Sequence, residues 1–378
     1  MIKMARFAIV EWAKLESQKV LMNNETLKIL IDKKEVDINA ADQYGHSALI
    51  YTVRNNATNC AKLLLDHGAD VNAVNNNGKT ALMYAGSVND SVECANLLIA
   101  YGANIDARDN DGATALIHAK SKCMCLLVDK GADVNASNIR GLTALMRSTR
   151  FDTIAPMEAL LGHGADVNAC INPGMNALFY AVCYDNPDSV RLLIKKGADV
   201  NKPDLNGDTV LMRSVFNSAN PACLVLLLAN GADTNAVNHN GKTAMSFAFG
   251  MEIYAAICIL ALYGAPFVTE QLIAIKKHIT KGKHPQLELI LENLKRPNLQ
   301  RQARRRIHQQ TTRVCRNTKY SNTIDALVKA GDLPMRSRSF MLFEDDIEEI
   351  IATLTNCDLG WAERHNFLTV FTLDQTNQ

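Results

Sequence analysis

Seven copies of one short phrase recur along this chain of 378 residues. The clearest copy reads Gly-Ala-Asp-Val-Asn-Ala over residues 68–73 and continues as Gly-Lys-Thr-Ala-Leu over residues 78–82. The second glycine of the phrase occurs at Gly45, Gly78, Gly112, Gly141, Gly174, Gly207 and Gly241. The steps between these glycines are 33, 34, 29, 33, 33 and 34 residues. A nearly fixed period of this length is typical of a solenoid, in which equal units stack side by side.

Each copy of the phrase introduces a unit that we expect to contain two short helices. The stretch from Thr80 to Ser87 predicts the first helix, because the threonine can cap its first free amides. The stretch from Val92 to Tyr101 predicts the second, since it has one apolar face and stops before Gly102. The Asn, Asp and Gly residues between helices favour turns, which predicts an extended finger. One unit cannot bury its apolar face alone, so the units must stack.

From Asp42 to about Val268 the chain resembles the ankyrin-repeat family, whose period and phrase it shares. The resemblance implies an all-α solenoid of helix-turn-helix units with β-hairpin-like fingers, followed here by a helical C-terminal domain. One departure is that the family's Thr-Pro-Leu-His reads Ser-Ala-Leu-Ile or Thr-Ala-Leu-Met in this chain. The family's buried histidine is replaced by Ile50, Met83, Ile117, Met146, Phe179 and Met212. We expect apolar packing to replace the hydrogen bond between repeats that this histidine makes.

The sequence predicts four segments. Residues 1–41 contain two helical stretches, at 5–17 and 25–33, that we expect to cap the N-terminal end of the stack. The remaining segments are residues 42–268 with the seven ankyrin repeats, residues 269–340 with a helical extension that includes a basic helix, and residues 341–378 with an F-box-like or helical segment.

Charge and hydrophobicity narrow the function. The formal net charge of +1 offers no bulk attraction to nucleic acid. No run approaches the roughly 18 apolar residues of a membrane span. The first ten residues lack the small-residue cleavage site of a secretory signal. These features predict a cytoplasmic protein, in the cytosol or nucleus of a host cell if the chain is a translocated effector.

Four of the ten cysteines share one position in the repeat, eight residues before a glycine: Cys60, Cys94, Cys123 and Cys223. This regularity predicts buried apolar side chains in a reducing compartment rather than disulfides. Cys123 and Cys125 form a Cys-x-Cys pair without a His or Cys partner at zinc spacing, so we expect no metal site. No glycine loop for phosphate is present either, and no cofactor is predicted.

Two sets of positions are expected to face the concave side of the solenoid: the finger tips, and the residue two places after the leucine of each Thr-Ala-Leu. Aromatic and arginine side chains are frequent in interface hot spots, and exposed apolar tips mark interfaces. The predicted partner-binding residues are Tyr51, Tyr84, His118, Ile139, Leu142, Arg147, Phe151, Met175, Tyr180, Tyr184, Leu205, Arg213 and Phe216. They point to a protein partner on repeats four to six. The alternative is that individual members pack between neighbouring repeats.

A basic stretch follows the repeats. Nine basic residues and no acidic one occur between Asn293 and Ile324, and apolar residues recur there every four positions, which predicts an amphipathic helix. This basic helix, residues 295–319, is compatible with a nuclear-import or nucleic-acid patch or with an anionic membrane surface. The alternative is a solvated face whose charge is balanced by the acidic residues at 344–349.

The chain from residue 342 onward resembles the beginning of an F-box. The matching residues are Leu342, Asp345, Ile347, Ile350, Ile351, Leu354, Asp358 and Leu359. The family's proline is Phe343 here, and only about twenty residues follow the match. Ankyrin proteins of poxviruses and some intracellular bacteria end in similar truncated segments, and this resemblance implies an adaptor that recruits a Skp-type ubiquitin-ligase subunit. The alternatives are an ordinary amphipathic helix with acids at its N-terminus and a secretion signal.

Candidate nucleophiles are confined to the C-terminal third. Cys315 lies between two arginines, which would favour its thiolate, and Cys357 could pair with His365. Neither belongs to a recognisable catalytic motif. The sequence therefore predicts a non-catalytic scaffold that binds a protein. A ubiquitin-ligase adaptor and an unrecognised enzyme are the competing hypotheses.

Overall fold

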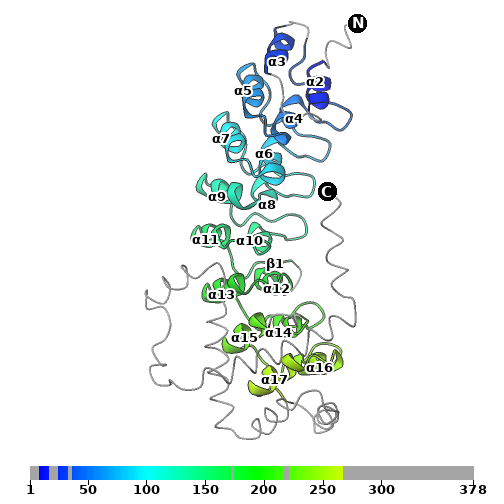
Figure 1. Cartoon of the computed structure of the whole chain (residues 1–378), viewed down its shortest axis with the longest axis vertical. Helices are drawn as coiled ribbons and strands as arrows, with labels where there is room; N and C mark the ends of the chain where they lie inside the picture. Colours follow the sequence, from blue (N-terminus) through cyan, green and yellow to red (C-terminus); the bar gives the residue numbers. More distant parts are fainter. Residues whose placement is uncertain (1–7, 17–23, 33–35, 172–173, 217–220, 267–378) are drawn as a thin grey trace. The chain divides into compact units, whose positions relative to one another are not determined.

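The computed structural model describes residues 8–16, 24–32, 36–171, 174–216 and 221–266. These residues form successive pairs of short helices, and extended fingers connect one pair to the next (Figure 1). Two compact units divide the chain. Unit 1 runs from Met1 to Tyr180 and unit 2 from Ala181 to Gln378. The predicted helical domain and F-box-like segment after residue 268 lie outside the described residues.

The helices fall into two sets according to their place in the repeat. The pair that precedes the first finger is α2 (Ala8–Glu16) and α3 (Asn24–Ile31). The first helices of the repeats are α4 (Ala48–Arg54), α6 (Ala81–Tyr84), α8 (Ala115–His118), α10 (Ala144–Ser148), α12 (Ala177–Cys183), α14 (Val210–Ser214) and α16 (Ala244–Gly250). The second helices are α5 (Thr58–Asp66), α7 (Val92–Ala100), α9 (Ser121–Asp129), α11 (Ala155–Gly162), α13 (Pro187–Lys195), α15 (Ala222–Ala229) and α17 (Tyr254–Leu262).

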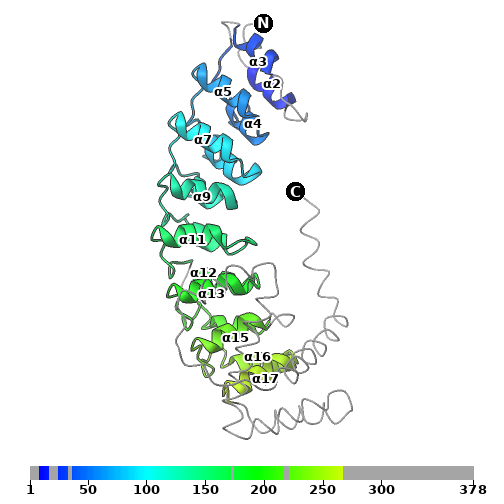
Figure 2. The ribbon, with the colours of Figure 1, turned by 60° about the vertical axis from the view of Figure 1, so that its left-hand side comes forward.

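Helices of one set pack on helices of the same set in the neighbouring repeat. In unit 1, α4, α6, α8 and α10 follow α2 in one layer (Figure 1), and α5, α7, α9 and α11 follow α3 in the other (Figure 2). In unit 2, α13, α15 and α17 form one layer, while α14 packs on α16. The predicted stack of helix pairs is thereby confirmed.

A hydroxyl residue begins most of the first helices. Thr80 Oγ1 accepts a hydrogen bond from the Met83 amide at 3.3 Å, and Ser47, Thr143, Thr209 and Thr243 cap their helices in the same way. The residues at the position of the family's histidine are buried, as predicted. Ile50, Met83, Ile117, Met146 and Met212 are all less than 2% exposed, and Phe179 is 8% exposed.

Most fingers are closed by an Asp or Asn side chain that folds back on its own turn. Asn75 Oδ1 accepts hydrogen bonds from the amides of Asn77 and Lys79, at 3.0 and 2.9 Å. Gly78 completes this turn with a φ of +74°, and a Cβ there would lie 2.6 Å from Asn110 Oδ1 of the next finger. Only glycine satisfies both conditions. The fingers contain little regular strand, and the longest pairing joins β1 (Cys170–Ile171) to β2 (Met175–Asn176).

The third repeat is shorter than its neighbours, as the 29-residue step predicted. Its first helix, α8, ends at His118, and Ala119 is already extended with a ψ of 147°. The preceding repeat instead continues from α6 into a turn of π-helix, η1 (Ala85–Asn89). The four missing residues are therefore lost after the first helix of repeat three.

Candidate functional site

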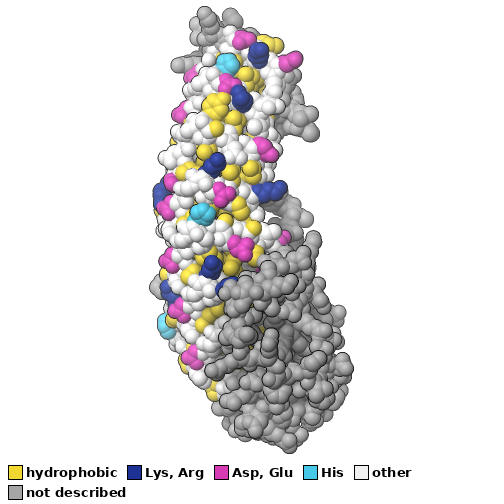
Figure 3. Space-filling model, turned by 90° about the vertical axis from the view of Figure 1, so that its left-hand side faces the viewer, with side chains coloured by type: hydrophobic (Ala, Val, Ile, Leu, Met, Phe, Trp, Pro, Cys, Tyr) yellow, Lys and Arg dark blue, Asp and Glu magenta, His cyan; other side chains and the backbone are white. Residues whose placement is uncertain are grey.

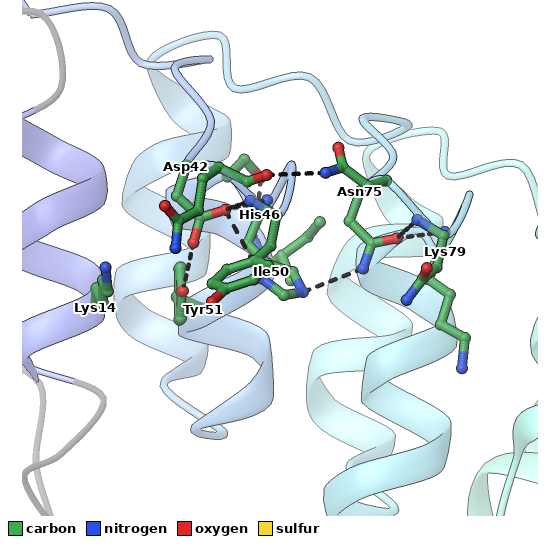
Figure 4. A network of polar contacts seen from close by, with 12 residues as sticks. Lys14, Asp42, His46, Ile50, Tyr51, Asn75 and Lys79 are labelled. Carbon is green, nitrogen blue, oxygen red and sulfur yellow. Dashed lines mark hydrogen bonds and ion pairs between the residues drawn. The ribbon is translucent and has the colours of Figure 1, made fainter.

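The column of residues predicted to bind a partner is tied to the fingers by polar contacts. The Tyr51 hydroxyl donates to Asp42 Oδ2 at 2.8 Å (Figure 4), and Asn75 Nδ2 donates to the Tyr84 hydroxyl at 2.9 Å. In repeat three, His118 Nε2 lies 2.7 Å from Asp109 Oδ2. In all three cases the helix residue follows its finger partner by nine positions. The same Asp or Asn that closes a finger therefore also fixes a side chain on the following first helix.

The first finger gathers an aromatic cluster around His46. The His46 ring lies 5.4 Å from the Tyr51 ring and 5.9 Å from the Tyr84 ring, both edge to face. His46 Nε2 is 3.2 Å from the Tyr84 hydroxyl and 3.1 Å from Asn75 Nδ2. The exposed ring of Tyr44 lies 6.2 Å away on the finger tip. Edge-to-face rings at these distances stabilise one fixed arrangement of the cluster.

Burial and hydrogen bonding shift the pKa values of this cluster. Burial would raise the pKa of Asp42, but hydrogen bonds from the His46 amide, the Tyr51 hydroxyl and the Tyr44 amide outweigh it and lower the pKa. Burial and the Asp42 carboxylate raise the pKa of Tyr51 to about 12. Burial also lowers the pKa of His46, with a contribution from the positive charge of Arg54. At neutral pH the cluster therefore holds a carboxylate, a neutral phenol and a neutral imidazole.

The pair in repeat three behaves in the same way. Burial lowers the pKa of His118 and outweighs the opposing hydrogen bond with Asp109, and the positive charges of Lys79 and Arg147 lower it further. Burial alone would raise the pKa of Asp109, yet its bonds to His118 and to the Ala113 amide leave the pKa lowered. These contacts hold His118 and Asp109 together as a structural support. None of them orients a side chain as a nucleophile.

A single guanidinium covers the aromatic cluster. The Cζ atom of Arg54 lies 5.8 Å from the centre of the Tyr51 ring and 5.4 Å from that of Tyr84. Among the described residues, no carboxylate is within ion-pair distance of Arg54. Neither Arg54 nor His46 is among the partner-binding residues predicted from the sequence. The available signal was spacing, because Arg54 follows Tyr51 by three positions on α4 and so shares its face.

One equivalent position of the finger tips is an asparagine in some repeats and an isoleucine in another. Asn76 Nδ2 donates to the Gln43 carbonyl and Asn110 Nδ2 donates to the Asn76 carbonyl, each at 2.9 Å, so amides link consecutive tips. In the next finger this position is Ile139. Its amide still donates to the Asp111 carbonyl at 2.9 Å, but its side chain is 74% exposed. An apolar side chain thus replaces an amide that would link two fingers.

The other predicted partner-binding residues lie at different depths. In unit 1, Tyr51 is only 8% exposed, so it belongs to the packed interior and is removed from the set of surface residues. Half-buried members of unit 1 are Tyr84, His118, Leu142, Arg147, Phe151, Met175 and Tyr180. In unit 2, Leu205 is 57% exposed, and Tyr184, Arg213 and Phe216 are exposed as well.

The cysteine column is buried but is not purely apolar. Cys60, Cys94, Cys123 and Cys223 are at most 1% exposed, as predicted, and each is a free thiol. Cys60 Sγ donates to Asn24 Oδ1 at 2.6 Å, and Cys94 Sγ lies 3.5 Å from Asn56 Oδ1. In the part of the chain that the structure describes, no group of three His, Cys, Asp or Glu residues has a metal-binding arrangement.

Comparison with known families agrees with this architecture. A family model described as three copies of ankyrin repeats matches residues 18–109, 73–138 and 113–204. A second model, described as many copies of ankyrin repeats, matches residues 183–228. Together the matches cover more than half of the chain. The chain belongs to the ankyrin-repeat family.

Two relatives share short stretches of these ankyrin repeats. The palmitoyltransferase akr1 of Schizosaccharomyces pombe is 44% identical over 50 residues, which are 13% of this chain and 8% of that protein. A putative ankyrin repeat protein of Fowlpox virus is 34% identical over 65 residues, 17% of this chain and 15% of its own length. The chain thus matches only a small part of either relative.

The surface formed by the second helices of the ankyrin repeats in unit 1 mixes both signs of charge. Lysine and arginine side chains alternate there with aspartate and glutamate among apolar patches (Figure 3). Within the described helices, none has both the length and the continuous apolar stretch required to cross a bilayer. The F-box-like residues from Leu342 to Leu359, the basic helix 295–319 and the candidate nucleophiles Cys315 and Cys357 all lie outside the described residues.

Proposed function

We propose that this ankyrin-repeat chain is a non-catalytic scaffold that binds a protein partner through its finger tips and first helices. Ankyrin repeats are generally protein–protein interaction modules, and the family match supports this class of function. The observation that carries the proposal is the exposed side chain of Ile139. Asn76 and Asn110 show that an amide at this position joins two fingers. Isoleucine gives up that bond and exposes apolar surface, and a protein partner accounts for this surface.

The variant Ile139→Asn tests this proposal. An amide at residue 139 can donate to the Asn110 carbonyl as its neighbours do, so the free energy of unfolding should change by no more than about 0.5 kcal/mol. Recovery of protein partners on the immobilised full-length chain should fall. Val74→Asn is the matched control, because Val74 is also an exposed apolar residue but precedes the finger turn. Equal recovery of every partner by wild type and Ile139→Asn would contradict the proposal.

A second candidate is a substrate adaptor that recruits a Skp-type subunit of a ubiquitin ligase. It is favoured by the acidic and apolar pattern that begins at Leu342 and resembles an F-box. A host-directed effector role is part of the scaffold proposal as well, and its support is that one relative is a putative ankyrin repeat protein of Fowlpox virus. Ile350→Asp combined with Leu354→Asp should abolish co-purification with a Skp-type subunit, whereas Thr353→Asp should not. Absence of any such co-purification with the wild type would refute the adaptor.

A further inference from the structure

Unit 2 contains a patch in which two phenylalanines and two cations lie together, and we refer to Arg213, Phe216, Lys242 and Phe247 as the Phe patch. The rings of Phe216 and Phe247 are 5.6 Å apart between centres and tilted by 54°. Arg213 Cζ lies 5.5 Å from the centre of the Phe216 ring, and Lys242 Nζ lies 5.4 Å from that of Phe247. The residues come from α14, α16 and the adjoining loops, and α14 packs directly on α16.

The cations of the Phe patch have no acidic partner among the residues that the structure describes. Arg213 Nε donates to Cys183 Sγ at 3.3 Å, and this bond holds the guanidinium in place. Lys242 contributes its charge from the finger and is exposed. Asp208, an acid of the neighbouring finger, accepts a hydrogen bond from Asn238 Nδ2 at 2.6 Å. A ligand with carboxylates can therefore pair with both cations without displacing an existing ion pair.

The apolar half of the Phe patch is also open. Phe216 is 40% exposed and Phe247 is half-buried beside it. Contact of such a ring with a partner costs little free energy, and burial of its remaining apolar area makes the free energy of binding more favourable. Cations fixed over aromatic rings lose little conformational entropy when a carboxylate binds, because they are already held in place.

We propose that the Phe patch binds an acidic and apolar segment of a protein partner. Carboxylates of the segment pair with Arg213 and Lys242, and a leucine or phenylalanine side chain packs against Phe216 and Phe247. Phosphates and bases could in principle use the same groups, but two cations provide few of the contacts on which nucleic-acid binding depends. The proposal rests on the proposed scaffold function and specifies the chemistry of its partner.

The test uses the full-length protein and fluorescein-labelled probes followed by fluorescence anisotropy. The probe is a synthetic peptide in which Asp and Glu alternate with Leu and Phe. A matched peptide has Lys in place of each acid, and an oligothymidine strand represents nucleic acid. We expect the acidic peptide to bind, with affinity that falls as salt rises, and the other two probes to bind at least about tenfold more weakly.

Variants then assign the binding to the Phe patch. Arg213→Glu with Lys242→Glu should weaken the acidic peptide by about tenfold or more, and Phe216→Ser should weaken it without reversing the charge preference. Lys196→Glu is the control, because Lys196 is an exposed cation at the end of α13. Thermal melting of each variant within a few degrees of wild type shows that binding is lost without loss of the fold.

Three outcomes overturn the inference: no binding of the acidic peptide, equal binding by wild type and the double charge reversal, or preference for oligothymidine. These outcomes are distinct from failure of the scaffold function. A protein partner that is lost with Ile139→Asn but retained with Arg213→Glu and Lys242→Glu would support the scaffold and refute the role of the Phe patch.

Discussion

The residue that joins the two helices of a repeat adopts a left-handed conformation at Asn56, Asp90 and Asp185, with φ values of 56°, 51° and 50°. Its side chain reaches the second helix of the following repeat. Asp90 accepts from the amides of Lys122 and Cys123, at 2.9 and 2.7 Å, and so caps α9. Asn and Asp tolerate this backbone conformation better than other side chains, and their oxygens satisfy free donors at a helix end. In these three repeats, one residue thus closes a loop and links two repeats.

Asp185 places a carboxyl at this position although its surroundings favour a neutral group. Burial raises the pKa of its carboxyl, and a hydrogen bond from Cys223 Sγ only partly opposes the shift. Asp185→Asn should therefore raise the free energy of unfolding at pH 7 by about 0.5–1 kcal/mol, because Asn56 makes the same kind of contact with Cys94 without charge. The sign follows from linkage: a raised folded-state pKa destabilises the ionised protein, so the advantage should disappear below pH 3.8. Urea unfolding at both pH values measures it, and a variant less stable than wild type at pH 7 would contradict the argument.

At the residue scale, the sequence predicts burial where the same type of residue recurs at one position of the repeat. It does not predict the polar contacts between repeats. The burial of the cysteine column followed from its regular spacing. The hydrogen bonds of Cys60 and Cys94 did not, because their acceptors are 36 and 38 residues away. Tyr51 was predicted on the surface since tyrosine is frequent at interfaces. Aspartates of the fingers were expected to form turns. That the Asp42 carboxylate also accepts a hydrogen bond from Tyr51 becomes visible only when the finger and α4 are placed together.

At some positions, packing between elements affects stability more than helix propensity does. Gly86 lies in the π-helical turn η1, and its carbonyl accepts from the Lys120 amide at 3.0 Å. A Cβ at this glycine would lie 3.2 Å from both Cα and Cβ of Ala119. Ala119 is extended because repeat three has lost residues after α8. A side chain at residue 86 would thus force this shortened segment to shift by a few tenths of an ångström.

Gly86→Ala should destabilise the protein by about 1–3 kcal/mol, since the backbone of Ala119 must move to admit a methyl group. Helix propensity alone predicts the opposite, a gain of about 1 kcal/mol. Gly162→Ala on α11 is the matched control, because no atom lies within 4 Å of its Cβ position, and it should be neutral or stabilising by up to about 1 kcal/mol. Urea unfolding of the two variants separates packing from propensity. Equal stabilisation by both substitutions would contradict this prediction, because it would show that the backbone of Ala119 moves at no cost in free energy.

The extent of each element was predictable where local chemistry sets it. The second helix expected at Val92 to Tyr101 is α7, Val92–Ala100, because a serine cap and a glycine stop define its ends. The first helix expected from Thr80 to Ser87 instead changes to η1 after Tyr84. No local signal in the sequence distinguishes an α-helical from a π-helical turn, and the contact with the segment at Ala119 is non-local. The shortened repeat three was predictable from the count of residues between glycines alone.

At the scale of the whole molecule, the described groups with shifted pKa values differ between the two units. Unit 1 holds His46 and His118, whose pKa values are lowered chiefly by burial. Unit 2 holds Asp185 and Asp188, whose pKa values are raised by burial. A histidine with a lowered folded-state pKa contributes stability that is lost as the pH falls below its unfolded value of 6.5. A carboxyl with a raised pKa costs stability at neutral pH, and acid relieves this cost. Mild acid should therefore destabilise the helices around His46 and His118 and should not destabilise those around Asp185 and Asp188.

Hydrogen exchange followed by mass spectrometry at pH 7 and pH 5, with exchange times corrected for the intrinsic rate, tests this difference. Protection of α4, α6 and α8 should decrease at pH 5, because protonating His46 and His118 places charge in partly buried sites. Protection of α13 and α15 should stay constant or increase as Asp185 and Asp188 approach protonation. His46→Gln with His118→Gln is the control, since it removes both titrations and should abolish the pH effect in unit 1 only. Equal loss of protection in both units at pH 5 would contradict the assignment of these histidines as the acid-sensitive groups.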